Sequence, residues 1–160
     1  MGSGKSVIGR KLAASLGLPF IDLDLEFESL YKITIENFFK KYSEDVFRNL
    51  ESKVLRQTET LSEGIISTGG GTPCFHKNME FINSNGTSIY LKASTEILLE
   101  RILSSHKPRP LLMNLSKAKM LEKIDTMLNQ RKKYYEEAKI TVESNNCDIN
   151  GLVEVLGTLK

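Results

Sequence analysis

The chain lacks the features that place a protein outside the ordinary globular class. Its two cysteines, Cys74 and Cys147, are too few and too far apart in sequence to predict a disulfide scaffold or a metal site. It has no run of about 18 apolar residues, so no membrane-spanning helix is expected. Its first residues also lack the apolar core of a signal peptide. We therefore expect a cytoplasmic protein whose thiols are reduced.

An excess of charge of either sign is missing as well. The 22 basic and 20 acidic residues leave a net charge of +2 and are spread without blocks. This balance predicts neither a nucleic-acid partner nor a membrane surface as a partner. At 160 residues the chain is long enough for one domain with a proper core. The expectation is a single monomeric domain over residues 1–160.

What the sequence does contain is an alternation of helical and strand patterns, with no internal repeat. Such an alternation predicts an α/β fold, in which helices cover both faces of a parallel sheet. Ligands of these sheets lie beyond the carboxyl ends of the strands. Strand patterns cover residues 20–24, 64–68, 87–92 and 140–143, and helical patterns cover 5–16, 25–31, 34–42, 43 to about 61, 76–83, 94 to about 103, 116 to about 139 and 148 onward. Gly17 is expected to end the first helix, and Ser43 and Ser94 are expected to cap two later ones. The apolar face of the helix after Ser43 is expected to contain Val46, Phe47, Leu50, Val54 and Leu55.

The phosphate loop, Gly2-Ser3-Gly4-Lys5-Ser6, precedes the first helical pattern. Glycines allow successive backbone amides to surround a phosphate, a lysine reaches the β and γ oxygens, and a hydroxyl ligates Mg²⁺. A helix amino terminus adds its dipole to anion binding. The alternative is that Met-Gly-Ser-Gly is an expression-vector scar. Gly9, which allows close packing of the helix on a sheet, favours the phosphate loop.

Two carboxylates, Asp22 and Asp24, end the first strand pattern. On a regular strand, residues two apart have side chains on the same side. A phosphate site needs a carboxylate near its metal, and Asp22 is placed to provide one through water. The alternative is that these acids cap the next helix or are simply solvated.

Gly69-Gly70-Gly71, the glycine loop, ends the second strand pattern. Three glycines cost backbone entropy, which favours a ligand lying against bare backbone over a merely flexible loop. Arg48 lies mid-helix, three residues before Glu51. Arg48 either forms a surface ion pair with Glu51 or binds a substrate carboxylate through two hydrogen bonds while Glu51 orients the guanidinium. The spacing alone does not decide between these two roles. Arg131 is one of several neighbouring cations and alone indicates little.

A polar, proline-bearing stretch covers residues 104–116 and contains Arg109 between two prolines. A loop of this length in a compact domain is typical of a lid or of disorder. An arginine on a lid would neutralise charge on a transferred phosphoryl group.

Six motifs now stand in register: G-S-G-K-S, F-I-D-L-D, F-R-N-L-E, S-T-G-G-G, R-P-L-L and R-K-K-Y-Y-E-E-A. In this order and at this spacing they resemble shikimate kinase, and the resemblance covers essentially the whole chain. It implies a three-layer P-loop NTPase fold of the nucleoside monophosphate kinase type, with a five-stranded parallel sheet and a lid at about 104–115. It also implies that MgATP phosphorylates the 3-hydroxyl of the small molecule shikimate, in the pathway to chorismate and aromatic amino acids.

The resemblance also assigns roles to residues on the nucleotide side. Lys5 would hold the β and γ phosphates, Ser6 would ligate Mg²⁺, and Asp22 would support the metal shell. Arg109 would reach the ATP phosphates from the lid, and Arg101 would lie near the adenine. The residues assigned to the nucleotide are Gly2, Ser3, Gly4, Lys5, Ser6, Val7, Arg101 and Arg109.

On the substrate side, Asp24 would bind the shikimate hydroxyls and help to deprotonate the attacking oxygen. Arg48 and Arg131 would grip the carboxylate, and Gly70 would donate its backbone, flanked by Gly69 and Gly71. Asp24, Lys5 and Arg109 are therefore the expected catalytic residues. Positioning and charge neutralisation are what phosphoryl transfer mainly requires.

The chain departs from the family pattern at three places. Val7 stands where threonine is frequent, and Lys133 where proline is frequent. The first strand and the first glycine of the phosphate-loop pattern, which would precede Gly4 by five residues, are absent. Because that strand is central in the family fold, its loss would leave neighbouring strands unpaired. We expect the natural protein to start about ten residues earlier and the chain as written to be unstable or inactive; equal melting temperature and turnover of both lengths would contradict this.

Three other interpretations stay open. The plainest is an α/β domain with a vector scar at its start, in which Lys5→Ala would have no effect on nucleotide binding. A gluconate kinase-like small-molecule kinase shares the loop and the fold, although the two arginines and the glycine loop favour shikimate. A nucleotide-binding module without catalysis would retain affinity for ATP but show no turnover with shikimate.

Overall fold

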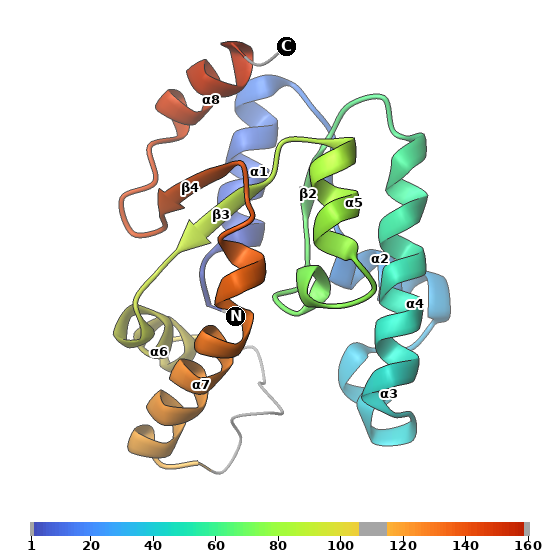
Figure 1. Ribbon diagram of the computed structural model, residues 1–160, viewed down its shortest axis with the longest axis vertical. Helices are drawn as coiled ribbons and strands as arrows, with labels where there is room; N and C mark the ends of the chain where they lie inside the picture. Colours follow the sequence, from blue (N-terminus) through green and yellow to red (C-terminus); the bar gives the residue numbers. More distant parts are fainter. Residues whose placement is uncertain (1, 106–114, 159–160) are drawn as a thin grey trace.

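Helices and strands alternate along the chain in the computed structural model, which describes residues 2–105 and 115–158 (Figure 1). The strands are short and the helices carry most of the ordered backbone. The strands are β1 Phe20–Asp22, β2 Ile65–Ser67, β3 Ile89–Lys92 and β4 Ile140–Glu143. The helices are α1 Lys5–Leu16, α2 Leu23–Tyr31, α3 Ile35–Lys41, α4 Glu44–Gln57, α5 Asn78–Asn85, α6 Thr95–Leu103, α7 Lys117–Tyr135 and α8 Ile149–Thr158, with 3₁₀ turns η1 Thr58–Thr60 and η2 Thr72–Cys74.

Local capping explains where many helices begin. The side chains of Thr34, Ser43, Ser94 and Ser116 each accept a hydrogen bond from the amide three residues on, at the starts of α3, α4, α6 and α7. Such caps satisfy one of the backbone donors that a helix start leaves unpaired. The predicted caps at Ser43 and Ser94 are confirmed. The predicted end of α1 at Gly17 is also confirmed, because Gly17 adopts φ 66° there.

The strands form two separate parallel pairs. β1 pairs with β2, with Phe20 opposite Ile65 and Asp22 opposite Ser67, and β3 pairs with β4, with Ile89 opposite Ile140. In the described part of the chain, the sheet predicted as one layer is therefore two short sheets. The register places the ends of β1 and β2 side by side, so that Asp22 lies next to the residues that lead into the glycine loop.

An apolar cavity of about 520 Å³ lies between the two pairs. The edges of β2 and β3 border it, and each of these strands has one strand neighbour among the described residues. Side chains of α1, α5 and α8 also line it, among them Leu12, Ile82 and Leu152. A strand lying between β2 and β3 would pair with the two backbone edges that border this cavity. The expectation about an earlier start of the chain stays a prediction.

Helices cover both faces of the strands. In Figure 1, α1 passes behind the strands and α5 lies in front of β2. α1 contacts β1, β2 and α8. Gly9 allows its close approach, because a Cβ at this position would lie 2.7 Å from the ring of Phe20. None of the helices in the described part of the chain combines the length and the apolar character needed to cross a membrane.

Two apolar clusters form the core on either side of the cavity. The first joins α2, α3 and α4 through packed aromatic rings, with the Phe27 ring 4.8 Å from that of Phe47. The second joins α6 and α7. The buried members of the first are Leu23, Phe27, Phe38, Phe47, Val54 and Leu55, and those of the second are Leu98, Leu99, Ile102 and Ile124.

Several predicted boundaries are wrong. The strand predicted over residues 20–24 ends at Asp22, because the Asp22 side chain caps α2 and draws Asp24 into the first helical turn. The helix predicted from 43 to about 61 ends at Gln57 and continues as a 3₁₀ turn. The long helix ends at Tyr135 and not at about 139. Val46 was expected on the buried face of α4 but is 42% exposed.

Candidate active site

The phosphate loop leads directly into α1. Gly2 and Gly4 have φ of 73° and 87°, in the left-handed region that favours glycine. The Gly4 carbonyl accepts hydrogen bonds from the amides of Val7 and Ile8, at 3.0 and 2.9 Å, which begins the helix. The amino end of a regular twelve-residue helix therefore lies where the sequence predicts a phosphate.

Arg101 supports this loop from α6. Its guanidinium donates to the carbonyl oxygen of Ser3 at 3.2 Å and to the hydroxyl of Ser144 at 2.9 Å. The interaction fastens the phosphate loop to the segment that follows β4. The place beside an adenine ring that the family resemblance implies for Arg101 stays a prediction.

Ser6 and Asp22 lie together at the start of α1 and the end of β1. The Ser6 hydroxyl donates to the Asp22 carboxylate at 2.6 Å, while the other carboxylate oxygen accepts the Asp24 amide at 3.2 Å. Asp22 therefore performs the capping role of the alternative interpretation and still meets the hydroxyl predicted for Mg²⁺. Hydroxyl and carboxylate oxygens fit Mg²⁺, which retains several waters and takes its other ligands from phosphates. Among the described residues, no group of three or more His, Cys, Asp or Glu side chains is placed to hold a metal ion.

Asp24 is solvent-accessible but has protein around most of its carboxylate. This partial desolvation raises the pKa of Asp24 above its ordinary value. The negative charge of Asp22 raises the pKa further, and the positive charge of Lys5 lowers it. A carboxylate whose pKa is raised toward neutrality is a better general base than an ordinary one.

Arg48 is a buried cation next to the glycine loop. Its guanidinium donates to Glu51 at 2.8 Å and to Glu44 at 2.8 Å. Glu51 is buried with it, whereas the Glu44 side chain is 58% exposed. A Cβ at Gly71 would lie 2.6 Å from the guanidinium, so a larger residue there would displace Arg48. The i,i+3 ion pair exists, but it is buried beside the loop instead of lying on the surface.

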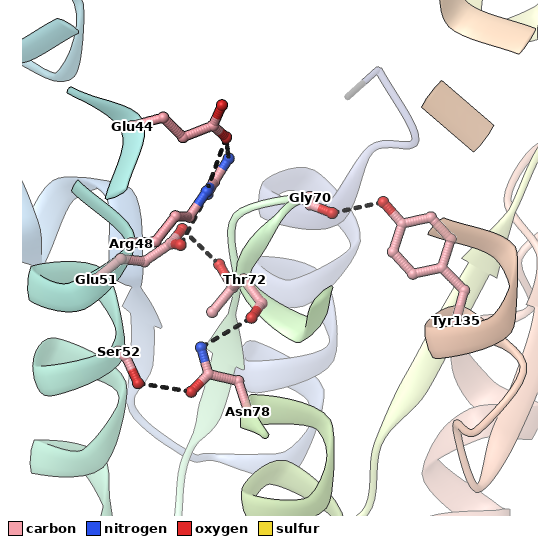
Figure 2. A network of polar contacts seen from close by, with 8 residues as sticks. All are labelled: Glu44, Arg48, Glu51, Ser52, Gly70, Thr72, Asn78 and Tyr135. Carbon is pink, nitrogen blue, oxygen red and sulfur yellow. Dashed lines mark hydrogen bonds and ion pairs between the residues drawn. The ribbon is translucent and has the colours of Figure 1, made fainter. Parts of the chain in front are cut away.

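A chain of buried hydrogen bonds holds the glycine loop (Figure 2). The Thr72 hydroxyl donates to Glu51 at 2.7 Å, and the Asn78 amide donates to the Thr72 carbonyl at 2.8 Å. The Ser52 hydroxyl donates to Asn78 at 2.7 Å. Thr72 and Asn78 are 0% exposed. The loop is therefore anchored to α4, in contrast to the flexible-loop alternative.

Arg131 and Tyr135 approach the glycine loop from α7. The Tyr135 hydroxyl donates to the Gly70 carbonyl at 2.5 Å, and Arg131 lies close enough to the Tyr135 side chain that it acts to lower the pKa of Tyr135. The positive charges of Arg131 and Arg48 both act to lower the pKa of Cys74, although burial raises it overall. The two arginines predicted to grip a carboxylate therefore converge on the same segment.

The structure brings together most of the residues that the sequence predicts. A Cβ at Gly69 would lie 2.9 Å from Glu51 and 3.1 Å from Asp24, which joins the acid to the loop. Arg109 and most of the predicted lid lie outside the described residues.

Sequence reasoning missed the residues that position the predicted ones. A signal existed for Tyr135, because it follows Arg131 by four residues and so shares its face of α7. No periodicity marks the other missed residues, which are Ser52, Thr72, Asn78 and Ser144.

Comparison with known proteins gives one consistent family. The family model described as shikimate kinase matches residues 1–156. A shikimate kinase of Azobacteroides pseudotrichonymphae is 40% identical over 157 residues, which cover 98% of this chain and 92% of that protein. One of Parabacteroides distasonis is 38% identical over 98% of this chain and 95% of that protein.

Solved structures agree with these relatives. The shikimate kinase of Bacteroides thetaiotaomicron superposes with a TM-score of 0.91 and 32% identity, over 99% of this chain and 93% of that one. The shikimate kinase of Acinetobacter baumannii, solved in complex with shikimate, superposes with a TM-score of 0.85 and 34% identity, over 99% of this chain and 87% of that one.

Proposed function

Because the chain belongs to the shikimate kinase family, a group of P-loop kinases that use ATP, we propose that it phosphorylates the 3-hydroxyl of shikimate. The product is shikimate 3-phosphate, on the route to chorismate and the aromatic amino acids. The observation that carries the proposal is the contact of Asp24, Arg48 and Glu51 with one glycine loop, beside the Ser6–Asp22 pair.

The substrate carboxylate is assigned to Arg48 and Arg131. Two guanidinium groups neutralise a carboxylate and fix its orientation by paired hydrogen bonds. Glu51 is buried and remains the fixed partner of Arg48, whereas Glu44 is exposed and is the partner that an incoming carboxylate replaces. This assignment favours an acid polyol with a planar carboxylate over a neutral sugar.

Asp24 is assigned to the reacting hydroxyl. It accepts the proton of that hydroxyl as the oxygen attacks the γ-phosphorus of ATP, and the bond from that phosphorus to the bridging oxygen of ADP breaks. Lys5 holds the β and γ phosphates at the start of α1. Ser6 and Asp22 would hold Mg²⁺, which when bound would neutralise charge on the phosphates. The roles of Arg101 at the adenine and of Arg109 from the lid complete the proposal.

The direct test is ADP release from ATP and Mg²⁺, measured with shikimate, with gluconate and with neither acid. In the chain extended at its amino end, we expect release that depends on shikimate, and we expect Lys5→Ala to abolish it. Release with gluconate alone would support the second kinase, and ATP binding without turnover would support a non-catalytic module. Omission of Mg²⁺ is expected to stop turnover, and restoration of activity on its return is the control.

We also propose that the enzyme is a cytoplasmic monomer. Its near-neutral charge and the absence of a membrane-crossing helix in the described residues are compatible with this. Sedimentation at working concentration tests the monomer, and a mass of two or more chains would contradict it.

A further inference from the structure

Tyr135 lies between two of the predicted substrate-binding groups, although nothing in the assignment above gives it a role. Its hydroxyl donates to the Gly70 carbonyl at 2.5 Å (Figure 2), and the charged side chain of Arg131 lies beside it. The hydrogen bond spans two parts of the molecule, because Tyr135 ends α7 whereas Gly70 follows β2. It is therefore a direct polar link from α7 to the glycine loop.

Both ends of this link are held in place. The Tyr135 ring stacks on that of Tyr90 in β3, with centroids 5.1 Å apart and planes inclined by 30°. At the other end, Thr72 and Asn78 fasten the segment after the loop to α4. Because other contacts hold both Tyr135 and the glycine loop, the hydrogen bond joins two fixed segments of the molecule.

The link also fixes the direction of a backbone donor. In a planar trans peptide, the carbonyl of Gly70 and the amide of Gly71 point in opposite directions. Since the carbonyl points at Tyr135, the Gly71 amide points away from α7, toward the side where Figure 2 shows Arg48. Gly71 is buried, and none of the described residues accepts a hydrogen bond from its amide. A buried donor without a protein partner is suited to a ligand oxygen.

We propose that Tyr135 is a positioning residue for the acid substrate: its hydroxyl holds the Gly70 carbonyl and thereby orients the Gly71 amide toward the substrate, on the loop that Arg131 approaches. Tyr135 itself does not touch the reacting atoms. The proposal rests on the proposed function, because it takes the acid that Arg48 and Arg131 hold as the substrate. Burial raises the pKa of the Tyr135 hydroxyl despite the opposing charge of Arg131, so this group remains protonated and able to donate.

Tyr135→Phe removes the hydroxyl and keeps the stacked ring. The matched control is Tyr90→Phe, which removes the hydroxyl of the other ring in the same stack. Loss of this part-buried hydrogen bond is expected to raise KM for shikimate about tenfold in Tyr135→Phe. KM for ATP and kcat are expected to stay within about twofold, because the phosphate loop is not touched. Tyr90→Phe should leave all three constants within about twofold.

A merely structural role gives a different pattern. The proposal would be overturned if KM for shikimate did not change in Tyr135→Phe. It would also be overturned if the KM values for both substrates rose together and the melting temperature fell. The test begins with the extended chain without a substitution, because absence of shikimate-dependent ADP release there contradicts the proposed function and not the link.

A second readout is independent of turnover. In a ¹⁵N-glycine spectrum, the amide of Gly71 reports on the hydrogen bond made by the carbonyl of the same peptide. We expect this signal to shift in Tyr135→Phe and not in Tyr90→Phe. An unchanged Gly71 signal in Tyr135→Phe would overturn the proposal whether or not the chain is active.

Discussion

One side of β2 and the loop that follows it are held by buried polar side chains, whereas the other edge of β2 borders an apolar cavity. On the polar side, Glu51, Thr72 and Asn78 form a continuous chain of hydrogen bonds that ends at the glycine loop. On the other side, a cavity of about 520 Å³ lies between β2 and β3. The contrast teaches that α4 and the turn after the loop fix the substrate side of the site through contacts that do not involve the cavity edge of β2.

The largest expected effect is on the polar side, at Asp24. Asp24→Asn removes the base but keeps the shape, so we expect kcat to fall by about 10²–10⁴-fold while the affinity for shikimate changes far less. Single-turnover kinetics with ATP and shikimate measure this. Glu26→Gln, in the same helical turn, is the control. A kcat of Asp24→Asn close to that of the control would show that Asp24 is not the base.

The two partners of Arg48 provide the next comparison. Glu51→Leu leaves a buried cation without its buried partner and is expected to reduce the free energy of unfolding by about 3 kcal/mol. Glu44→Gln removes only the exposed partner and should reduce it by less than about 1 kcal/mol. Urea unfolding of both variants measures the difference. Similar losses would mean that the buried pair does not anchor the loop.

Stability variants on opposite sides of β2 test the contrast itself. Asn78→Leu leaves the buried Thr72 carbonyl without its donor and the Ser52 hydroxyl without its acceptor. We therefore expect the free energy of unfolding to fall by about 2–3 kcal/mol. Ile89→Val, at the cavity, should cost less than about 0.5 kcal/mol, because the deleted methyl group already borders open space. Chemical denaturation of both variants gives the values. An equal loss would contradict the difference between the two sides.

The smallest expected effect is on the pH dependence of stability. The pKa of Asp24 is raised in the folded state, mainly by desolvation and then by Asp22. Its contribution is therefore fully present below the unfolded-state pKa and is lost as pH rises through the folded-state pKa. The melting temperature of Asp24→Asn relative to the unmodified chain should accordingly be higher at neutral pH than in acid. A difference that does not depend on pH would show that the carboxylate is not perturbed.

Much of the fold followed from local sequence patterns. The end of α1 at Gly17, the caps at Ser43 and Ser94 and the strand at 140–143 are all governed by interactions between near neighbours, and these predictions are confirmed. The strand predicted to include Asp24 was wrong for an equally local reason, because an aspartate at a helix start competes with strand continuation.

The site was predictable only where its residues form motifs. The phosphate loop and the glycine loop are contiguous and recognisable, whereas the side chains that hold the glycine loop come from separate elements. Ser52, Thr72 and Asn78 meet through the packing of α4 against α5, which no periodicity encodes. Tyr135 was the exception, because its spacing from Arg131 placed both on one helix face.

The central claim is that one pocket, formed by α2, α4, the glycine loop and α7, holds a small cyclic acid beside the phosphate loop. A crystal structure of the chain with shikimate and ADP tests it most directly. We predict that the carboxylate lies between Arg48 and Arg131, with a ring hydroxyl at Asp24. Shikimate bound elsewhere, or side chains of these three residues directed away from one another around it, would contradict the account.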